Sequence, residues 1–257
     1  MTANFAHYTP YYDLLYSDKN YHAEVEYLCE LIYEHTKMST YSLLELGCGT
    51  GIHASIMASH GLSVFGVDLS SEMLEFAQAR AKKEGFKSPQ LSFEKGDART
   101  FRISRKFDVV VSLFHVLSYQ TAEVDLQAMM QTAAIHLESD GLFIFDFWYG
   151  PAVLWQRPIV RAKRLANDQL EIIRLAEPVV HDAINTVDVN YTVLIKDKLS
   201  KKINEIKETH TMRYLFLPEI DLLLDANGFE RIGAEEWLTR KSPSLDTWGV
   251  CVIARKK

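Results

Sequence analysis

The feature that most constrains the fold is a short apolar run followed at once by three glycines at alternate positions. Residues 43–51 read LLELGCGTG, and residues 52–60 behind them have a helical composition. This order predicts a strand, a tight turn and a helix, with backbone brought close to a ligand where no β-carbon can be accommodated. The spacing G-x-G-x-G is not the G-x-G-x-x-G of dinucleotide-binding folds, and no P-loop lysine follows. We therefore expect the loop to cradle something other than a pyrophosphate.

The same alternation continues along the first half of the chain and predicts an α/β fold. Short apolar runs and longer helical segments in turn are typical of a parallel sheet with helices on both faces. The expected strands are residues 42–46, 63–67, 90–94, 107–112, 141–147, 229–237 and 247–255. The expected helices are residues 21–33, 52–60, 71–84, 123–137 and 218–226. These segments predict a doubly wound, Rossmann-like sheet of seven strands.

Residues 151–213 break this rhythm. They contain β-leaning stretches separated by turn residues, and apolar side chains alternate with polar ones between Val187 and Val193. Such alternation favours an antiparallel sheet with one covered face. We expect residues 1–150 and 214–257 to form the core, with a lid and first helix in residues 1–40. The segment 151–213 is interpreted as a β-rich insertion that lies over the main sheet and caps the acceptor side.

Charge and cysteine content exclude several classes of function. The chain has 28 basic and 34 acidic side chains, a net charge of −6, which argues against a sequence-independent grip on nucleic acid. Cys29, Cys48 and Cys251 are widely spaced, so neither a disulfide framework nor a metal site is expected, and a reducing, cytoplasmic setting fits. No apolar run approaches the roughly 18 residues of a membrane span, and no leader is expected.

The glycine loop with its preceding acid resembles the first motif of the class I S-adenosylmethionine-dependent methyltransferases. In that family an acidic residue and a further residue precede G-x-G-x-G, as they do here at Glu45. The resemblance implies S-adenosylmethionine as cofactor and S-adenosylhomocysteine as product. It also implies a cradle for the methionine end of the cofactor, with Glu45 supporting the turn. The loop residues expected to bind the cofactor are Gly47, Cys48, Gly49 and Gly51.

An acidic residue also ends the second expected strand. Asp68 lies at the carboxyl edge of a doubly wound sheet, where a carboxylate can accept hydrogen bonds from both ribose hydroxyls. The alternative role, capping the next helix, is already served by Ser70 and its neighbour. Leu69 and Met73 are expected to pack on the purine, although Met73 also suits a plain helix core.

Two further stretches complete the resemblance. Asp97 and Ala98 follow the third strand and resemble the second family motif, in which a carboxylate accepts from the adenine amino group and a backbone N–H donates to the ring; an ordinary turn is the alternative. After the fourth strand, Leu113 and Phe114 are expected to bind the cofactor. Since the family places methyl donor and acceptor here, the catalytic candidates are His115, which also fits a core histidine, Tyr119 and Tyr12.

The N-terminal segment 8–16 is unusually aromatic. Tyr11, Tyr12 and Tyr16 are expected to form a lid over the donor, and Tyr16, with Tyr21 just beyond, to bind the cofactor; a hydrophobic staple for the first helix is the alternative. This segment, the stretch 114–119 and the insertion are similar to bacterial N-methyltransferases of nucleotide-linked amino sugars. Those enzymes tend to carry a histidine near Tyr119 and a PWW-type sequence where this chain reads DFWY, so sugar and methyl count stay open.

Three functions remain. The first is N-methylation of a small molecule, an amino sugar linked to a nucleotide. The second is O- or carboxyl-methylation of another small metabolite by the same fold. The third is a nonenzymatic S-adenosylmethionine-binding protein. The partner expected in the first two is a small-molecule acceptor, with no nucleic acid or membrane, and the protein itself is expected to be a monomer or homodimer.

Overall fold

The first half of the chain folds into a parallel sheet, as the alternation of apolar and helical segments predicts. The computed structural model describes residues 9–36 and 41–257, so Tyr8 of the aromatic segment and the other residues of 1–8 and 37–40 lie outside the described part. The parallel strands are β1 (Ser42–Leu46), β2 (Ser63–Asp68), β3 (Leu91–Lys95), β4 (Phe107–Ser112) and β5 (Leu137–Tyr149). Their order in space is β3-β2-β1-β4-β5, so the strand order reverses between β1 and β4.

Two C-terminal strands complete this sheet. The strand β11 (Gly249–Lys256) pairs antiparallel with β5, and β10 (Phe229–Glu236) pairs antiparallel with β11. Among the described residues this gives the path β3-β2-β1-β4-β5-β11-β10, which confirms the expected seven-stranded core. The carboxyl ends of β1, β2 and β4 therefore meet at one edge, where the expected site residues follow each strand.

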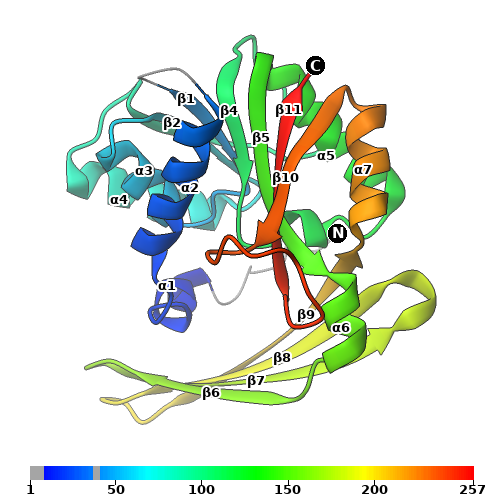
Figure 1. Ribbon diagram of the computed structural model, residues 1–257. Coiled ribbons are helices and arrows are strands. Elements are labelled where there is room, and N and C mark those ends of the chain that lie inside the picture. Colours follow the sequence, from blue (N-terminus) through cyan, green and yellow to red (C-terminus); the bar gives the residue numbers. More distant parts are fainter. Residues whose placement is uncertain (1–8, 37–40) are drawn as a thin grey trace.

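Helices cover both faces of the sheet (Figure 1). Strand residues alternate between the two apolar clusters: Leu44 packs with the helices of residues 123–136 and 217–226 on one face, and Leu43 packs with those of residues 21–35 and 52–59 on the other. The helices are α2 (Tyr21–His35), α3 (Ile52–Ser59), α4 (Ser71–Glu84), α5 (Glu123–His136) and α7 (Leu217–Ala226). No helix within the described ranges is long and apolar enough to cross a membrane.

The β-rich insertion lies beyond the carboxyl ends of the core strands, not over the face of the sheet as expected (Figure 1). Its antiparallel strands are β6 (Arg161–Ala166), β7 (Leu170–His181), β8 (Thr186–Asp197) and β9 (Ile203–Leu215). The reason is that β5 extends beyond the end of β4. The strand β4 pairs with β5 only as far as Phe145, and β9 then pairs with Trp148 and Tyr149. The helices already occupy both faces.

Three short helical segments lie beside the insertion and the first core helix. The helix α6 (Gly150–Gln156) precedes the expected β-leaning stretches of the insertion, and its Pro151 sits in the first turn, where a missing N–H costs nothing. Before α2, the chain forms η1 (Thr9–Tyr11) and α1 (Tyr12–Leu15). Figure 1 shows α1 between the core and the insertion, and Asp13 of α1 accepts a hydrogen bond from Thr50 of the glycine loop.

Candidate active site

The three loop glycines all adopt positive φ, but they do so for different reasons. A β-carbon at Gly47 would lie 2.6 Å from Val116 Cγ2, and one at Gly51 would lie 2.8 Å from Phe93 Cζ. At these two positions the absence of a side chain lets Val116 and Phe93 pack against the backbone of the loop. At Gly49, where φ is 55°, a β-carbon would meet nothing within 4 Å. Gly49 therefore has free space around it, as a cradle would need, and its role in binding the cofactor remains a prediction.

Asp68 ties this loop to the end of β2. Its Oδ2 accepts from the N–H of Gly49 at 2.8 Å, and its Oδ1 accepts from the N–H of Ser70 at 2.9 Å. Burial raises the pKa of the Asp68 carboxyl, and the backbone donors oppose that rise. The cap of α4 is made by Ser70, whose Oγ accepts from the N–H of Met73 at 3.2 Å, so Asp68 is not needed for capping. The ribose role of Asp68 remains a prediction.

Glu45 does not support the turn as expected. The N–H groups of Gly47 and Cys48 both donate to the carbonyl of Val67, at 2.8 and 3.0 Å. The Glu45 side chain is 1% exposed, and its Oε2 has no hydrogen-bond partner among the described residues. Burial, then the charge of Asp68, raises its pKa to about 8. Its Oε1 lies 3.9 Å from His53 Nδ1, so one oxygen has a neighbour and the other is open to a ligand that brings a positive amino group.

A half-buried cation that the sequence did not reveal, Lys19, interacts electrostatically with this acid. The Lys19 ammonium is 4.4 Å from the centroid of the Tyr21 ring and 4.3 Å from that of Phe114. It also forms an ion pair with Glu24, which lies 2.7 Å from His53 Nε2. Burial lowers the pKa of Lys19. The aromatic faces at this edge therefore already accept a cation, a property that also suits a sulfonium.

The expected lid tyrosines contact the loop after β4. The rings of Tyr12 and Tyr16 are 4.8 Å apart, and Tyr16 meets Phe114 edge-on at 5.0 Å. Burial raises the pKa of Tyr12, with Tyr16 and then Tyr21 adding to the rise. These contacts join the tyrosines to the site as well as to each other, which is the arrangement that the lid hypothesis requires.

The segment carrying these tyrosines is held from two sides. Asp13 accepts from Thr50 Oγ1 at 2.7 Å and pairs with Arg80 at 2.6 Å, which fixes α1 to the glycine loop and α4. On the other side Leu15 is fully buried, and the Lys163 ammonium of β6 donates to its carbonyl at 2.8 Å. The helix α1 is thus bound to both the core and the insertion.

The adenine-side residues are arranged less simply. Asp97 is bound by Arg99, with Nη2 to Oδ2 at 2.5 Å, and this side-chain pair lowers the pKa of the carboxyl. Arg99 also pairs with Asp125 at 2.9 Å. If Asp97 contacts adenine as predicted, its carboxylate does so while it is also bound to Arg99. The neighbouring Ala98 is half-buried.

The apolar candidates differ in exposure. Leu69 is 51% exposed at the edge and is available to a ligand, whereas Met73 and Leu113 are buried. Met73 projects from the covered face of α4, which agrees with its alternative role in the helix core. Cys48 is also buried, and burial raises the pKa of its thiol well above the ordinary value.

The chain is strained where β4 ends. Phe114 and His115 both have φ of 63°, a conformation that is uncommon outside glycine and clusters at functional sites. The buried Asp146 of β5 accepts from the N–H of His115 at 3.1 Å, which helps to hold the turn. His115 Nδ1 lies 2.6 Å from Asp146 Oδ2, close enough for an ion pair but without the alignment of a hydrogen bond. His115 remains a candidate base.

Tyr119 ends the short helical turn η2 (Val116–Tyr119) and reaches the insertion. Its hydroxyl lies 3.0 Å from Nδ1 of His210 on β9, and Nε2 of His210 lies 3.1 Å from Glu208. Burial raises the pKa of Tyr119 and lowers that of His210. His210 and Glu208 were not among the predicted site residues. Tyr119 is thus joined to a histidine and an acid from a distant part of the chain.

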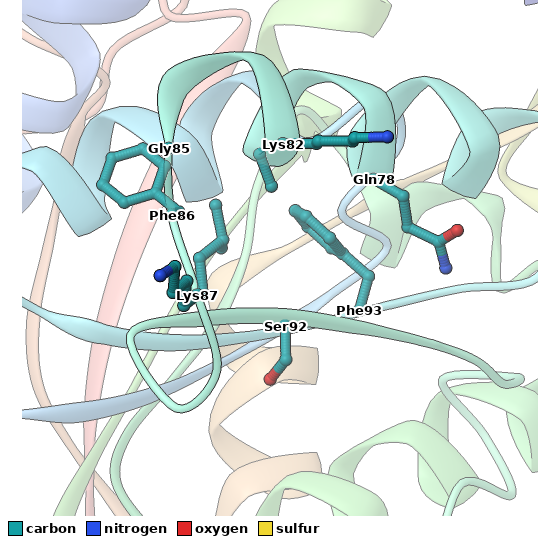
Figure 2. Close-up of a pocket in the computed structure, with 9 residues that line it drawn as sticks. Gln78, Lys82, Gly85, Phe86, Lys87, Ser92 and Phe93 are labelled. Atoms are coloured by element: carbon teal, nitrogen blue, oxygen red, sulfur yellow. The ribbon is translucent and has the colours of Figure 1, made fainter.

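A surface hollow of about 370 Å³ lies between α4 and β3 (Figure 2). Phe93 projects from β3 into it, beside Lys82 and Lys87 on the surrounding segments. The same ring packs against the backbone of Gly51 and Gly66. None of the expected catalytic or cofactor residues lines this hollow.

The chain resembles known proteins in both sequence and fold. Residues 43–141 match a family model described as a methyltransferase domain. A dTDP-3-amino-3,4,6-trideoxy-alpha-D-glucopyranose N,N-dimethyltransferase from Streptomyces venezuelae is 28% identical over 222 residues, covering 84% of this chain and 87% of that protein. A dTDP-3-amino-3,6-dideoxy-alpha-D-glucopyranose N,N-dimethyltransferase from Streptomyces fradiae is 31% identical, covering 54% of this chain and 52% of that protein.

Solved structures show the same fold. An S-adenosylmethionine-dependent methyltransferase from Clostridium acetobutylicum matches with a TM-score of 0.82 at 21% identity, covering 96% of each chain. DesVI from Streptomyces venezuelae matches with a TM-score of 0.79 at 24% identity, covering 96% of this chain and 98% of that one. Both matches extend over core and insertion alike.

Proposed function

Because the chain is a methyltransferase that uses S-adenosylmethionine, with residues 43–141 as its methyltransferase domain, we propose that it methylates the amino group of a nucleotide-linked amino sugar. The observation that carries the acceptor is the 222-residue similarity to an amino-sugar N,N-dimethyltransferase, which includes residues outside the methyltransferase domain. All the residues expected to bind the cofactor lie in the core. A similarity that continues past it therefore supports a related acceptor.

The residues present suit the cofactor. Gly49 opens onto free space, the Glu45 carboxyl has an orphaned oxygen, and Asp68 ends the neighbouring strand. In this proposal Glu45 receives the methionyl amino group and Asp68 the ribose. When bound, S-adenosylmethionine supplies a methyl group that is already activated by a positively charged sulfur. The protein then has to align the acceptor and exclude water.

The remaining groups act on the acceptor. Tyr12 and Tyr16 cover the site from α1, and Phe114 forms its wall. An amine enters mostly protonated at neutral pH and must lose a proton before it can attack, so a positioned acceptor for that proton accelerates the reaction. Two such groups face this edge, the His115–Asp146 pair and Tyr119 with His210.

The test is a transfer assay with S-adenosylmethionine labelled in its methyl group. The substrates are a panel of nucleotide-linked amino sugars, each paired with the analogue in which a hydroxyl replaces the amine. We expect label in the amino sugars and none in their partners. Transfer to hydroxyl or carboxyl acceptors alone would identify the second class of methyltransferase, and cofactor binding without transfer to any acceptor would indicate a nonenzymatic role.

A further inference from the structure

We propose that His210 and Glu208, on β9 of the insertion, are positioning residues that let Tyr119 take a proton from the acceptor amine. This inference rests on the proposed function and adds to it the part of the protein that removes the proton. It assigns the insertion a chemical role in addition to covering the site.

The geometry forms a continuous path from core to insertion. The Tyr119 hydroxyl lies 3.0 Å from His210 Nδ1, and His210 Nε2 lies 3.1 Å from Glu208 Oε2. Since both ring nitrogens have partners, their roles follow from the partners: Nε2 carries the proton that the Glu208 carboxylate accepts, and Nδ1 accepts from the tyrosine O–H. Tyr191 of β8 packs edge-on against the imidazole at 5.0 Å and fixes the plane of the ring.

The electrostatic surroundings keep His210 neutral until a proton arrives. Its side chain is 2% exposed, and burial lowers its pKa. Arg174, from β7, opposes a positive charge on the ring, whereas Glu208 favours one. Tyr119 from η2 and Tyr191 from β8 also pack against the ring. A buried neutral imidazole beside a carboxylate can accept a proton without creating an unpaired buried charge.

The other end of the path faces the site. Tyr119 ends η2, which directly follows the loop where Phe114 meets Tyr16 edge-on, and Tyr119 also contributes to the raised pKa of Tyr12. The pKa of Tyr119 is itself raised, first by burial and then by Tyr16. A phenol with a raised pKa stays neutral at neutral pH. Tyr119 therefore has to pass on its own proton when it receives one from the amine.

The step is a double proton transfer. The acceptor enters as an ammonium ion and gives one proton to Tyr119 Oη, while the Tyr119 O–H proton passes to His210 Nδ1. The nitrogen keeps its lone pair as a neutral amine, and the imidazole becomes an imidazolium whose Nε2–H is bound by Glu208. Total charge is unchanged, and the imidazolium later loses its proton to solvent.

The kinetic test compares His210→Asn with the wild type on an amino sugar that the wild type methylates. Asparagine can keep a polar atom near Nδ1 but cannot carry the proton. We expect kcat at neutral pH to fall by about a hundredfold, with KM nearly unchanged. The variant should also recover as pH rises, because it depends on amine that is already neutral, while the wild type changes less over that range.

A matched control is His181→Asn. His181 pairs with Asp188 at 2.9 Å in the same sheet, outside the Tyr119–His210–Glu208 path. Its kcat and pH profile should match the wild type. A His210→Asn variant that binds S-adenosylmethionine normally by calorimetry and keeps the wild-type kcat and pH profile would overturn the inference.

A second measurement does not depend on turnover. Nitrogen NMR of histidine-labelled protein without cofactor should show His210 protonated at Nε2 and unprotonated at Nδ1, and Tyr119→Phe should shift the Nδ1 signal. A proton on Nδ1 would reverse the path and exclude the mechanism even in an active amino-sugar enzyme. If no amine is methylated, both proposals fall; if amines are methylated but the proton lies on Nδ1, only this one does.

Discussion

At the scale of the residue, the sequence revealed the groups whose partners are local. Asp68 and Ser70 could be assigned because strand end, turn and helix start follow one another within a few positions. Glu24 and His53, or Tyr119 and His210, could not be paired, since they are 29 and 91 positions apart and only the folded sheet brings them together. Arg99 is an exception to this pattern. It pairs with Asp97 only two positions away, yet the pairing was not predicted.

Asp68→Ala should weaken S-adenosylmethionine binding at least tenfold, or about 1.4 kcal/mol, because two charge-assisted hydrogen bonds to the ribose are lost. Titration calorimetry measures the change. Glu94→Ala removes an equal charge from an exposed position on the neighbouring strand β3 and should leave the affinity as it is. Unchanged affinity in Asp68→Ala would overturn the ribose assignment.

Glu45 should make stability fall as pH rises. Its folded pKa of about 8 lies above the ordinary carboxyl value, so the folded state binds the proton more tightly than the unfolded chain. The stabilisation is complete in acid and is lost between about pH 4.5 and 8, on the order of 1 kcal/mol per pH unit. Urea unfolding should show this loss in the wild type relative to Glu45→Gln.

The exposed Glu72 offers the control for that slope. Glu72→Gln removes a carboxyl that is ionised in both folded and unfolded chains at neutral pH, so its stability should follow the wild-type slope between pH 6 and 8. Parallel curves for the wild type and Glu45→Gln would show that Glu45 titrates normally, against our account.

At the scale of the element, the order of strands and helices was predictable because each carries its own period and its own ends. The helix α4 begins at its Ser70 cap and ends at Gly85, whose φ of 82° terminates it, and both ends can be read from the sequence. The insertion was placed wrongly because its position depends on β5 extending past β4 to pair with β9. That pairing is long-range and has no local signal.

Gly49→Ala should separate folding from cofactor binding. Its φ of 55° imposes about 1 kcal/mol of backbone strain, but no atom lies within 4 Å of the new β-carbon. Gly85→Ala, at the end of α4, has positive φ and equally open surroundings, and it serves as the control. We expect similar small losses of stability in both variants and a loss of S-adenosylmethionine affinity in Gly49→Ala alone. Equal affinities would show that the cofactor does not approach Gly49.

At the scale of the whole molecule, the site lies where three parts of the chain meet. The core supplies the glycine loop and strand ends, the insertion supplies His210, and α1 is held between them by Asp13 and Leu15. The seven-stranded fold followed from the sequence pattern, and the aromatic N-terminus was recognised as important. The contacts that hold α1 were not predicted, because the partners Arg80 and Lys163 lie on elements far away in sequence.

Leu15→Ala should loosen α1 without unfolding the core. The side chain is fully buried against Ile172, Val193 and Ile195, and such truncations cost about 2–5 kcal/mol. Hydrogen exchange should accelerate for the amides of α1, while those of β1 and β4 stay protected. Val179→Ala, an exposed truncation on β7, should change neither. Equal acceleration in α1 and β1 would mean that α1 is not a separate, detachable part.

The central claim is that this chain methylates an amine of a nucleotide-linked sugar. The most direct measurement is a competition in which an amino sugar and its hydroxyl analogue, at equal concentration, share S-adenosylmethionine with a carbon-13 methyl group. Carbon NMR distinguishes the N-methyl product from the O-methyl one in the same tube. We predict an N-methyl signal on the amino sugar alone. An O-methyl signal alone, or neither signal from protein that binds the cofactor, would contradict the account.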